Sequence, residues 1–535
     1  MASPSSKLSL DPASVLLARE LARRAGEPVT QLARTHTTVS VERAVLRLGG
    51  LDGADGDGLP WVNRLTDAVR ESVGLEHGVA LPVWDALDVG GYPDLRTLAE
   101  AASAGKARFR LPPARATGRA RELALRSLSA GLSDLDRQRD LRARMAADLG
   151  EPTLPWVQLI VATGDLDRDV PLAQAAARQG ADVIAVLRPA RPPLPDYVPE
   201  QAMPGGDAGG YPTRAGFRRL RAALDQASRE LGRYVRLTGY ASGLCMPEIA
   251  LLGGFERLDM LLSDCLHQII VRDVNPVRIF IDQRFARALA ARAGITVSPG
   301  EESYLDTPDT VASAPTVVVS QLLNEYFGRE AGLETEQIGI GHAFEVDPAV
   351  PDSFLLELAQ AQLIRELFPG APLKYMPSAR DATGAGAGGG AAGCLLDAFF
   401  NLAGLMTEQS MLLVGAVTEP AGRPGQGGAE AALASVLYVR QAAGRLGLSF
   451  APDSFVTERA QQVLAEAIGL LRRISTDGLL HAVAEGTFGV ARRPPDGGQG
   501  LAGVVPRAEG YFNPATSLLE GTDSGAQGDP MAELI

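Results

Sequence analysis

Residues 156–188, WVQLIVATGDLDRDVPLAQAAARQGADVIAVLR, decide the fold. Two apolar runs, 156–164 and 181–188, flank a segment whose apolar residues recur at helical spacing. Short apolar runs rich in branched side chains and bounded by Gly and Asp are typical of buried strands. A strand, helix and strand in roughly 30 residues predict two parallel strands joined by a crossover helix.

The same alternation continues along the chain to about residue 449. We predict eight strands, at 156–164, 181–188, 234–240, 258–264, 294–298, 337–345, 372–377 and 411–419. Helix-length segments with an apolar face separate them. Eight strand and helix pairs favour a TIM (β/α)8 barrel over an open doubly wound sheet, which the same alternation also permits.

The residues on either side of this stretch have a different character. Residues 1–150 are charged and mostly helical in pattern, and residues 450–535 hold one long helix followed by a Gly- and Pro-rich tail. We therefore expect a helical N-terminal region at 1–150, the barrel at 151–449 and a C-terminal extension at 450–535.

Composition restricts the class of protein. Of the 535 residues, 46% are hydrophobic and 21% charged, as in an ordinary water-soluble protein, and the net charge of −13 argues against binding nucleic acid or an anionic membrane. No run approaches the roughly 20 apolar residues of a spanning helix. The N-terminus lacks the apolar core of a signal peptide. The three cysteines, Cys245, Cys265 and Cys394, are widely spaced, which favours the cytoplasm over a disulfide framework.

Chemistry in a TIM barrel lies at the C-terminal ends of the strands. Polar residues near these ends are Arg188, Ser242, Asp264, His267, Glu301, Glu302, His342, Glu345, Lys374, Thr418 and Glu419. His342 and Glu345 are three residues apart, but a zinc site needs a third ligand and the sequence offers none nearby. We therefore expect no metal.

The segment 241–250, ASGLCMPEIA, joins a predicted strand to a predicted helix. Ser242 and Gly243 at the strand end, with Pro247 in the first helical turn, supply a hydroxyl and free N–H groups that form an anion site. A plain tight turn is the alternative. Cys245 as a nucleophile needs a base and an orienting group, which the spacing does not supply.

Two further segments carry candidate groups. After the fourth predicted strand, the His267 ring could stack on a flat cofactor and Arg272 could pair with a phosphate or carboxylate, while a structural role is the alternative for both. After the fifth, GEESY at 300–304 carries two carboxylates suited to an amine or to acid–base chemistry. The Gly-rich segment 383–393 lacks the Lys-Ser/Thr pair of a P-loop, so we expect a loop there.

Several of these segments, taken together, resemble the alpha subunit of lysine 5,6-aminomutase. The matching segments run in order along nearly the whole chain. They are HTTVSVERAVLRLGGLDGAD (36–55), LIVATGDLDRDVPLAQAAARQGADVIAVLR (159–188), SGLCMPEIA (242–250), GEESYLDT (300–307), IGIGHAFEVDP (338–348), APLKYMP (371–377) and GTFGVARRPPDGGQGLAGVVPRAEGYFNP (486–514).

The resemblance implies a TIM-barrel subunit that carries pyridoxal 5′-phosphate (PLP). It implies a smaller beta subunit that binds adenosylcobalamin and supplies the Schiff-base lysine, in a hetero-tetramer of two alpha and two beta chains. This fits a chain with only Lys7, Lys106 and Lys374 as lysines. The implied reaction is a radical 1,2-migration of the amino group from C6 to C5 of D-lysine or L-β-lysine, in lysine catabolism.

The resemblance also implies roles for single residues. Arg188, Ser242, His267, Arg272 and Ser303 are the expected cofactor contacts. Glu302 and Lys374 are the expected substrate contacts, and no catalytic residue is assigned within this chain.

This chain departs from the family pattern at or next to several of the expected cofactor and substrate contacts. Prolines stand at 189, 192 and 193 where the family has a polar loop, His267 replaces a tyrosine, and Glu302 with Ser303 replaces an Asp-Asn pair. Proline has no N–H to donate to a phosphate. Two alternatives follow: a paralogue that binds the cobalamin subunit but has lost the PLP site, or an aminomutase for another diamino acid.

Overall fold

The computed structural model describes most of the chain. The described residues are 6–187, 195–200, 211–299, 310–342, 346, 350–375, 391–414, 426–489 and 492–519. For residues 310, 342, 373–375, 391–394 and 426–429 it describes the backbone alone.

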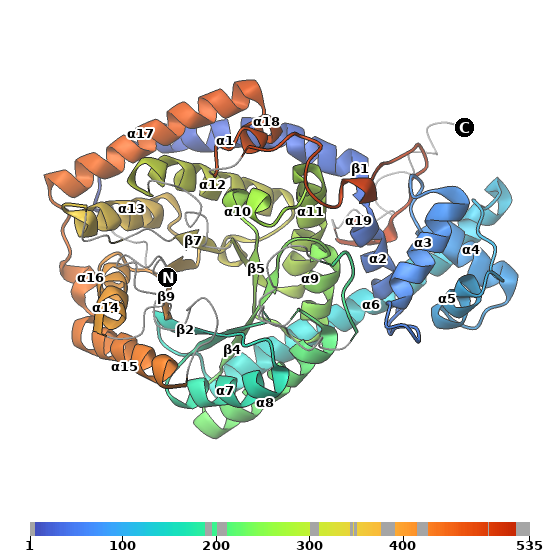
Figure 1. Cartoon of the computed structure of the whole chain (residues 1–535), viewed down its shortest axis with the longest axis horizontal. Helices are drawn as coiled ribbons and strands as arrows, with labels where there is room; N and C mark the ends of the chain where they lie inside the picture. Colours follow the sequence, from blue (N-terminus) through green and yellow to red (C-terminus); the bar gives the residue numbers. More distant parts are fainter. Residues whose placement is uncertain are drawn as a thin grey trace.

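A parallel eight-stranded sheet forms the centre of the molecule (Figure 1). Its strands coincide with the eight predicted apolar runs. They are β2 (Trp156–Val161), β3 (Val183–Val186), β4 (Arg236–Ala241), β5 (Met260–Ser263), β6 (Thr296–Pro299), β7 (Ile340–His342), β8 (Leu373–Tyr375) and β9 (Met411–Val414). The strand order is β6-β5-β4-β3-β2-β9-β8-β7, so the first and last strands of the chain order are neighbours.

The two ends of this sheet also meet. Val297 in β6 forms a parallel bridge with Ile338, just before β7, and the Gly339 N–H donates to the Val297 carbonyl at 2.8 Å. An open doubly wound sheet has no such contact between its edge strands. The barrel predicted from the sequence is therefore confirmed.

Helices surround the barrel, one or more after each strand. They are α7 (Leu166–Arg178), α8 (Arg214–Leu231), α9 (Met246–Phe255), α10 (Leu266–Val271), α11 (Pro276–Ala293), α12 (Thr310–Glu330), α13 (Ser353–Leu367), α14 (Ala391–Met406) and α15 (Gln426–Ala443). Several begin with a side-chain cap. Asp165, Thr213 and Asn275 accept hydrogen bonds from the free N–H groups of α7, α8 and α11.

Most of the described residues before β2 are helical. The helices are α1 (Pro12–Thr35), α2 (Val39–Leu48), α3 (Trp61–Val73), α4 (Ala80–Gly90), α5 (Leu95–Ser103) and α6 (Ala114–Leu149). Helices α3 to α5 lie to one side of the barrel (Figure 1). By contrast, α1 packs on the barrel helices α11 and α12, and every residue of α2 is buried, with α2 packed on α9.

The C-terminal residues pack on helices of the barrel and of the N-terminal region. After α16 (Leu446–Ser449), the long predicted helix is α17 (Ser454–Asp477), which packs on α1, α12 and α13. The chain continues through α18 (Leu479–Ala484) to β10 (Val504–Pro506) and α19 (Pro514–Leu519). Strand β10 pairs antiparallel with β1 (His36–Thr38), a contact between the two ends of the chain that the sequence pattern did not predict.

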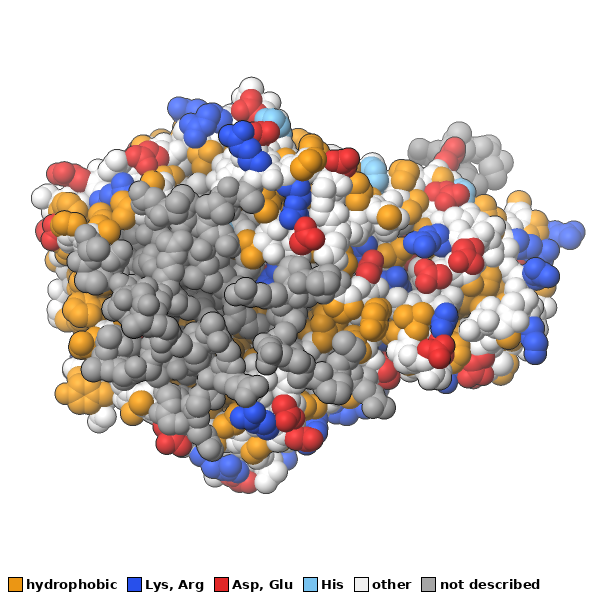
Figure 2. Space-filling view, viewed as in Figure 1, with side chains coloured by type: hydrophobic (Ala, Val, Ile, Leu, Met, Phe, Trp, Pro, Cys, Tyr) orange, Lys and Arg blue, Asp and Glu red, His pale blue; other side chains and the backbone are white. Residues whose placement is uncertain are grey.

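The described surface mixes basic and acidic side chains on the face shown in Figure 2. Hydrophobic side chains gather along its left edge, over α14 to α16, and Tyr438 and Leu448 are 74% and 83% exposed. Within the residues that the structure describes, no helix is both long and apolar enough to cross a membrane.

Candidate functional site

Two hydrogen-bond donors and one ion-paired arginine converge on a single carboxylate where β4 and β5 end. Asp264, directly after β5, accepts from the Ser242 hydroxyl at 2.5 Å and from the Gly243 N–H at 2.6 Å. The Arg272 Nε lies 3.6 Å from the same carboxylate. A hydroxyl, a backbone N–H and a guanidinium around one anion form the donor set that proteins use for carboxylates and phosphates.

The carboxylate at this place is fully buried. Burial raises the pKa of Asp264, while Arg272, Ser242 and Gly243 act in the opposite direction without cancelling the effect of burial. The Gln283 amide donates to the Asp264 backbone carbonyl at 2.7 Å and holds the residue in place. The anion at this site is thus supplied by the chain itself, and its proton affinity is increased.

The local backbone directs these donors. Gly243 has a φ of +76° and Cys245 a φ of +69°, so the chain turns sharply between β4 and α9. Glycine adopts such a φ without strain, whereas Cys245 does so at a cost. The turn leaves the Ser242 hydroxyl and the Gly243 N–H on the side of Asp264.

The imidazole of His267 lies in the following helix, α10. Burial lowers the pKa of His267 to about 3, and the side chain is 2% exposed. Its Nε2 lies 3.0 Å from the Thr316 hydroxyl of α12, and its ring meets Phe488 edge-on with centroids 5.5 Å apart. The ring is therefore neutral at physiological pH.

The thiol of Cys245 is not suited to nucleophilic attack. It is fully buried, and burial, followed by the carboxylates of Glu248 and Asp196, raises its pKa well above the ordinary value. A thiolate is the reactive form of cysteine, so this thiol stays protonated and inert. Among the described residues, no group of three or more His, Cys, Asp and Glu could hold a metal ion.

The structure places some of the predicted site residues and leaves others outside its description. Ser242 and Arg272 meet at Asp264, and His267 lies on the helix that Arg272 terminates. Arg188, Glu302 and Ser303 lie outside the described residues, and Lys374 is described only as backbone within β8.

Sequence reasoning gave no role to Asp264, although it stands at a strand end. The signal was its position as the last residue of the predicted strand 258–264, beside another predicted strand that is also followed by polar residues. It also missed Thr316 and Phe488, which contact the His267 ring from segments distant in the chain. Nothing in the local sequence connects them to His267.

Comparison with known proteins identifies related chains. The family model described as the D-lysine 5,6-aminomutase TIM-barrel domain of the alpha subunit matches residues 8–518. The lysine 5,6-aminomutase alpha subunit of Acetoanaerobium sticklandii is 41% identical over 522 residues, which are 97% of this chain and 99% of that one. The corresponding subunit of Fusobacterium nucleatum subsp. nucleatum is 39% identical over the same shares of both chains.

A shorter similarity extends to a second kind of protein. The D-ornithine 4,5-aminomutase subunit beta of Acetoanaerobium sticklandii is 30% identical over 250 residues, covering 45% of this chain and 33% of that one.

Proposed function

Because this chain belongs to the family of lysine 5,6-aminomutase alpha subunits, we propose that the donors at the end of β4 hold the phosphate of PLP. The relatives are named as subunits of lysine 5,6-aminomutase, and the family resemblance implies that the amino group moves from C6 to C5 of D-lysine or L-β-lysine. The alternative of a paralogue that binds the cobalamin subunit but has lost the PLP site is not favoured by a match over 97% of the chain.

The residues present fit a phosphate. Ser242, Gly243 and Arg272 already surround one anionic group, and this convergence is the observation that carries the proposal. A phosphate takes these donors once the Asp264 carboxyl is protonated or turned away. Burial raises the pKa of Asp264, so protonation beside an incoming anion costs less than it does for an exposed aspartate.

We propose that the ring of His267, which stands where the family has a tyrosine, packs against the pyridine ring of the cofactor. Because the imidazole is neutral, it adds no positive charge beside the cofactor. When bound, PLP supplies the conjugated ring that stabilises an unpaired electron during migration. Arg188 and Ser303 as further cofactor contacts, and Glu302 and Lys374 as substrate contacts, remain proposals that rest on the family resemblance.

We further propose a beta subunit that binds adenosylcobalamin, in a hetero-tetramer of two alpha and two beta chains. The relatives are themselves alpha subunits by name, which supports a second kind of chain. The cytoplasm remains the proposed location, and this proposal rests on the wide spacing of the three cysteines in the sequence. Native mass spectrometry of the co-expressed subunits tests the stoichiometry directly.

Turnover by the assembled enzyme tests the proposed activity. The chain would be purified with the cobalamin-binding subunit, supplied anaerobically with PLP and adenosylcobalamin, and given D-lysine, L-β-lysine or ornithine. Since the product has the mass of the substrate, derivatised diamino acids would be separated by chromatography before mass spectrometry. We expect the 5-amino isomer from a lysine substrate. A complex that assembles but forms no isomer, beside an active relative, would contradict the proposal.

A further inference from the structure

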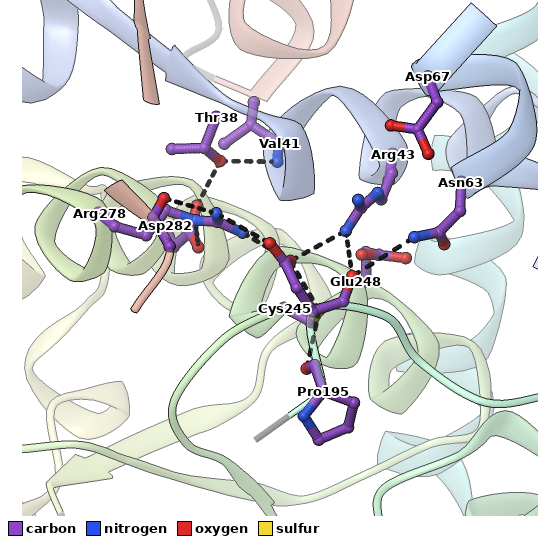
Figure 3. Close-up of polar contacts among 12 residues, drawn as sticks. Thr38, Val41, Arg43, Asn63, Asp67, Pro195, Cys245, Glu248, Arg278 and Asp282 are labelled. Carbon is purple, nitrogen blue, oxygen red and sulfur yellow. Dashed lines mark hydrogen bonds and ion pairs between the residues drawn. The ribbon is translucent and has the colours of Figure 1, made fainter. Parts of the chain in front are cut away.

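A buried network of charges lies beside the start of α9 (Figure 3). Two arginines of α2, Arg43 and Arg47, stand one helical turn apart and are 5% and 4% exposed. Arg47 Nε donates to Glu248 Oε2 of α9 at 2.8 Å. Arg43 Nη1 donates to Asp196, to its carbonyl at 2.6 Å and to its carboxylate at 3.0 Å. A helix of the N-terminal region is thus ion-paired to the barrel.

Helix α11 contributes to the same network. Arg278 donates to the Asp196 carboxylate from both terminal nitrogens, at 3.1 and 3.3 Å, and to Asp282 at 2.6 Å. Burial acts to raise the pKa of Asp196, but Arg278 and Arg43 outweigh it and lower the pKa. Asp196 is therefore ionised, and the Cys245 thiol lies 3.7 Å from its carboxylate.

Helix α9 begins without the usual support. Its N-cap residue is Cys245, which has a left-handed backbone conformation and whose side chain makes no capping hydrogen bond. Ser, Thr, Asp and Asn are the residues that normally cap this position. Glu248, in the first turn, is fully buried and turned toward Arg47. The ion pair to α2 thus holds the first turn of α9 where a cap is missing.

Stability alone does not account for this ion pair. A buried pair costs desolvation, and apolar residues of similar volume are often as stabilising. Within the described residues, Glu248 Oε1 and Arg47 Nη2 have no partner, which adds to the cost. Ionic pairs of this kind are retained in some proteins because they define a geometry.

That geometry is the one that directs the phosphate donors. Ser242 and Gly243 precede Cys245 by two to three residues in the same turn. We propose that Glu248, held by Arg47, is a positioning residue that fixes the start of α9 and thereby the Ser242 hydroxyl and Gly243 N–H. This inference rests on the proposed function, because the donors matter only if a phosphate binds them.

Binding of an aldehyde-free cofactor analogue tests the inference. Pyridoxine 5′-phosphate cannot form an imine with a lysine, and pyridoxine lacks only the phosphate. Calorimetric titration of the complete alpha and beta complex with each compound isolates the contribution of the phosphate. We expect Glu248→Gln and Arg47→Gln each to weaken binding of pyridoxine 5′-phosphate about tenfold, and to leave pyridoxine unchanged. The double variant should lose no more than either single variant.

A buried ion pair elsewhere supplies the control. Asp225 is 6% exposed and accepts from Arg221 at 2.7 Å and from Arg257 at 2.6 Å. Arg221 also donates to the Val235 carbonyl just before β4, at the end of the barrel opposite Ser242. Asp225→Asn should lower the melting temperature and leave the binding of both compounds as in the parent.

Hydrogen exchange provides a readout that needs no ligand. In Glu248→Gln and Arg47→Gln, the amides of residues 241–250 should exchange faster than in the parent, and in Asp225→Asn they should not. If both variants melt lower but keep the exchange of this segment and the preference for the phosphate, the pair is merely structural and the inference is overturned. If the parent itself shows no preference for the phosphate, the proposed function fails, and this inference fails with it.

Discussion

The pH dependence of stability should reveal the neutral imidazole of His267. The folded pKa is about 3 because of burial, whereas an unfolded imidazole titrates near 6.5. Below about pH 6.5 His267 is protonated in the unfolded chain but stays neutral in the folded chain. His267 therefore contributes stability that is fully present above pH 6.5 and is lost as the pH falls toward 3.

The magnitude follows from the two pKa values. Between pH 7 and pH 5 the loss attributable to His267 is about 2 kcal/mol, and any folded pKa below about 4 yields nearly the same figure. The unfolding entropy of a chain of this length is on the order of 1 kcal/mol per degree. The parent should thus lose about 2 °C more than a His267→Phe variant over this pH interval.

Thermal unfolding followed by fluorescence, at a fixed scan rate and ionic strength, would measure the difference. His267→Phe keeps a ring beside Phe488 and removes the titrating group. Thr316→Val is the matched control, because it removes the 3.0 Å contact to Nε2 but keeps the imidazole. Its melting temperature should fall with pH as steeply as that of the parent. Parallel curves for the parent and His267→Phe would refute the reasoning.

Three further predictions concern other parts of the molecule. Gly118→Ala on the open face of α6 should raise the free energy of unfolding by up to about 1 kcal/mol. Gly131→Ala in the same helix should lower it by about 1–3 kcal/mol, because the added Cβ would lie 2.0 Å from the Leu48 carbonyl oxygen. Equal melting temperatures for the two variants would contradict this packing. Ser242→Ala should weaken calorimetric binding of pyridoxine 5′-phosphate about tenfold through loss of one charge-assisted hydrogen bond, and an unchanged affinity would remove Ser242 from the phosphate site. Cys245 should resist iodoacetamide at pH 8 until the chain is unfolded, as read by peptide mapping, since burial raises its pKa; rapid alkylation of the folded chain would show that the thiol is accessible.

The barrel was predictable from the sequence because a buried strand and a crossover helix each leave a local pattern. The apolar runs at 156–164 and 411–419 contain β2 and β9, which pair in the structure although the rest of the barrel separates them in the chain. The run of strands also predicted where Ser242 would stand. The antiparallel pair of β1 and β10 left no such pattern, because its strands are only three residues long.

The sequence by itself determined the order of strands and helices, the family, and the strand ends at which Ser242 and Arg272 stand. Only the tertiary structure decided that Asp264 accepts a hydrogen bond from Ser242 and forms an ion pair with Arg272. It also decided that Arg47 pairs with Glu248, 201 residues away in the chain. The physical reason is that the buried face of a helix or strand repeats at a fixed spacing, so its apolar residues form a pattern that can be recognised in the local sequence. The partner of a buried charge is chosen by packing between distant elements, and the same Arg or Glu in the same local sequence could equally face water.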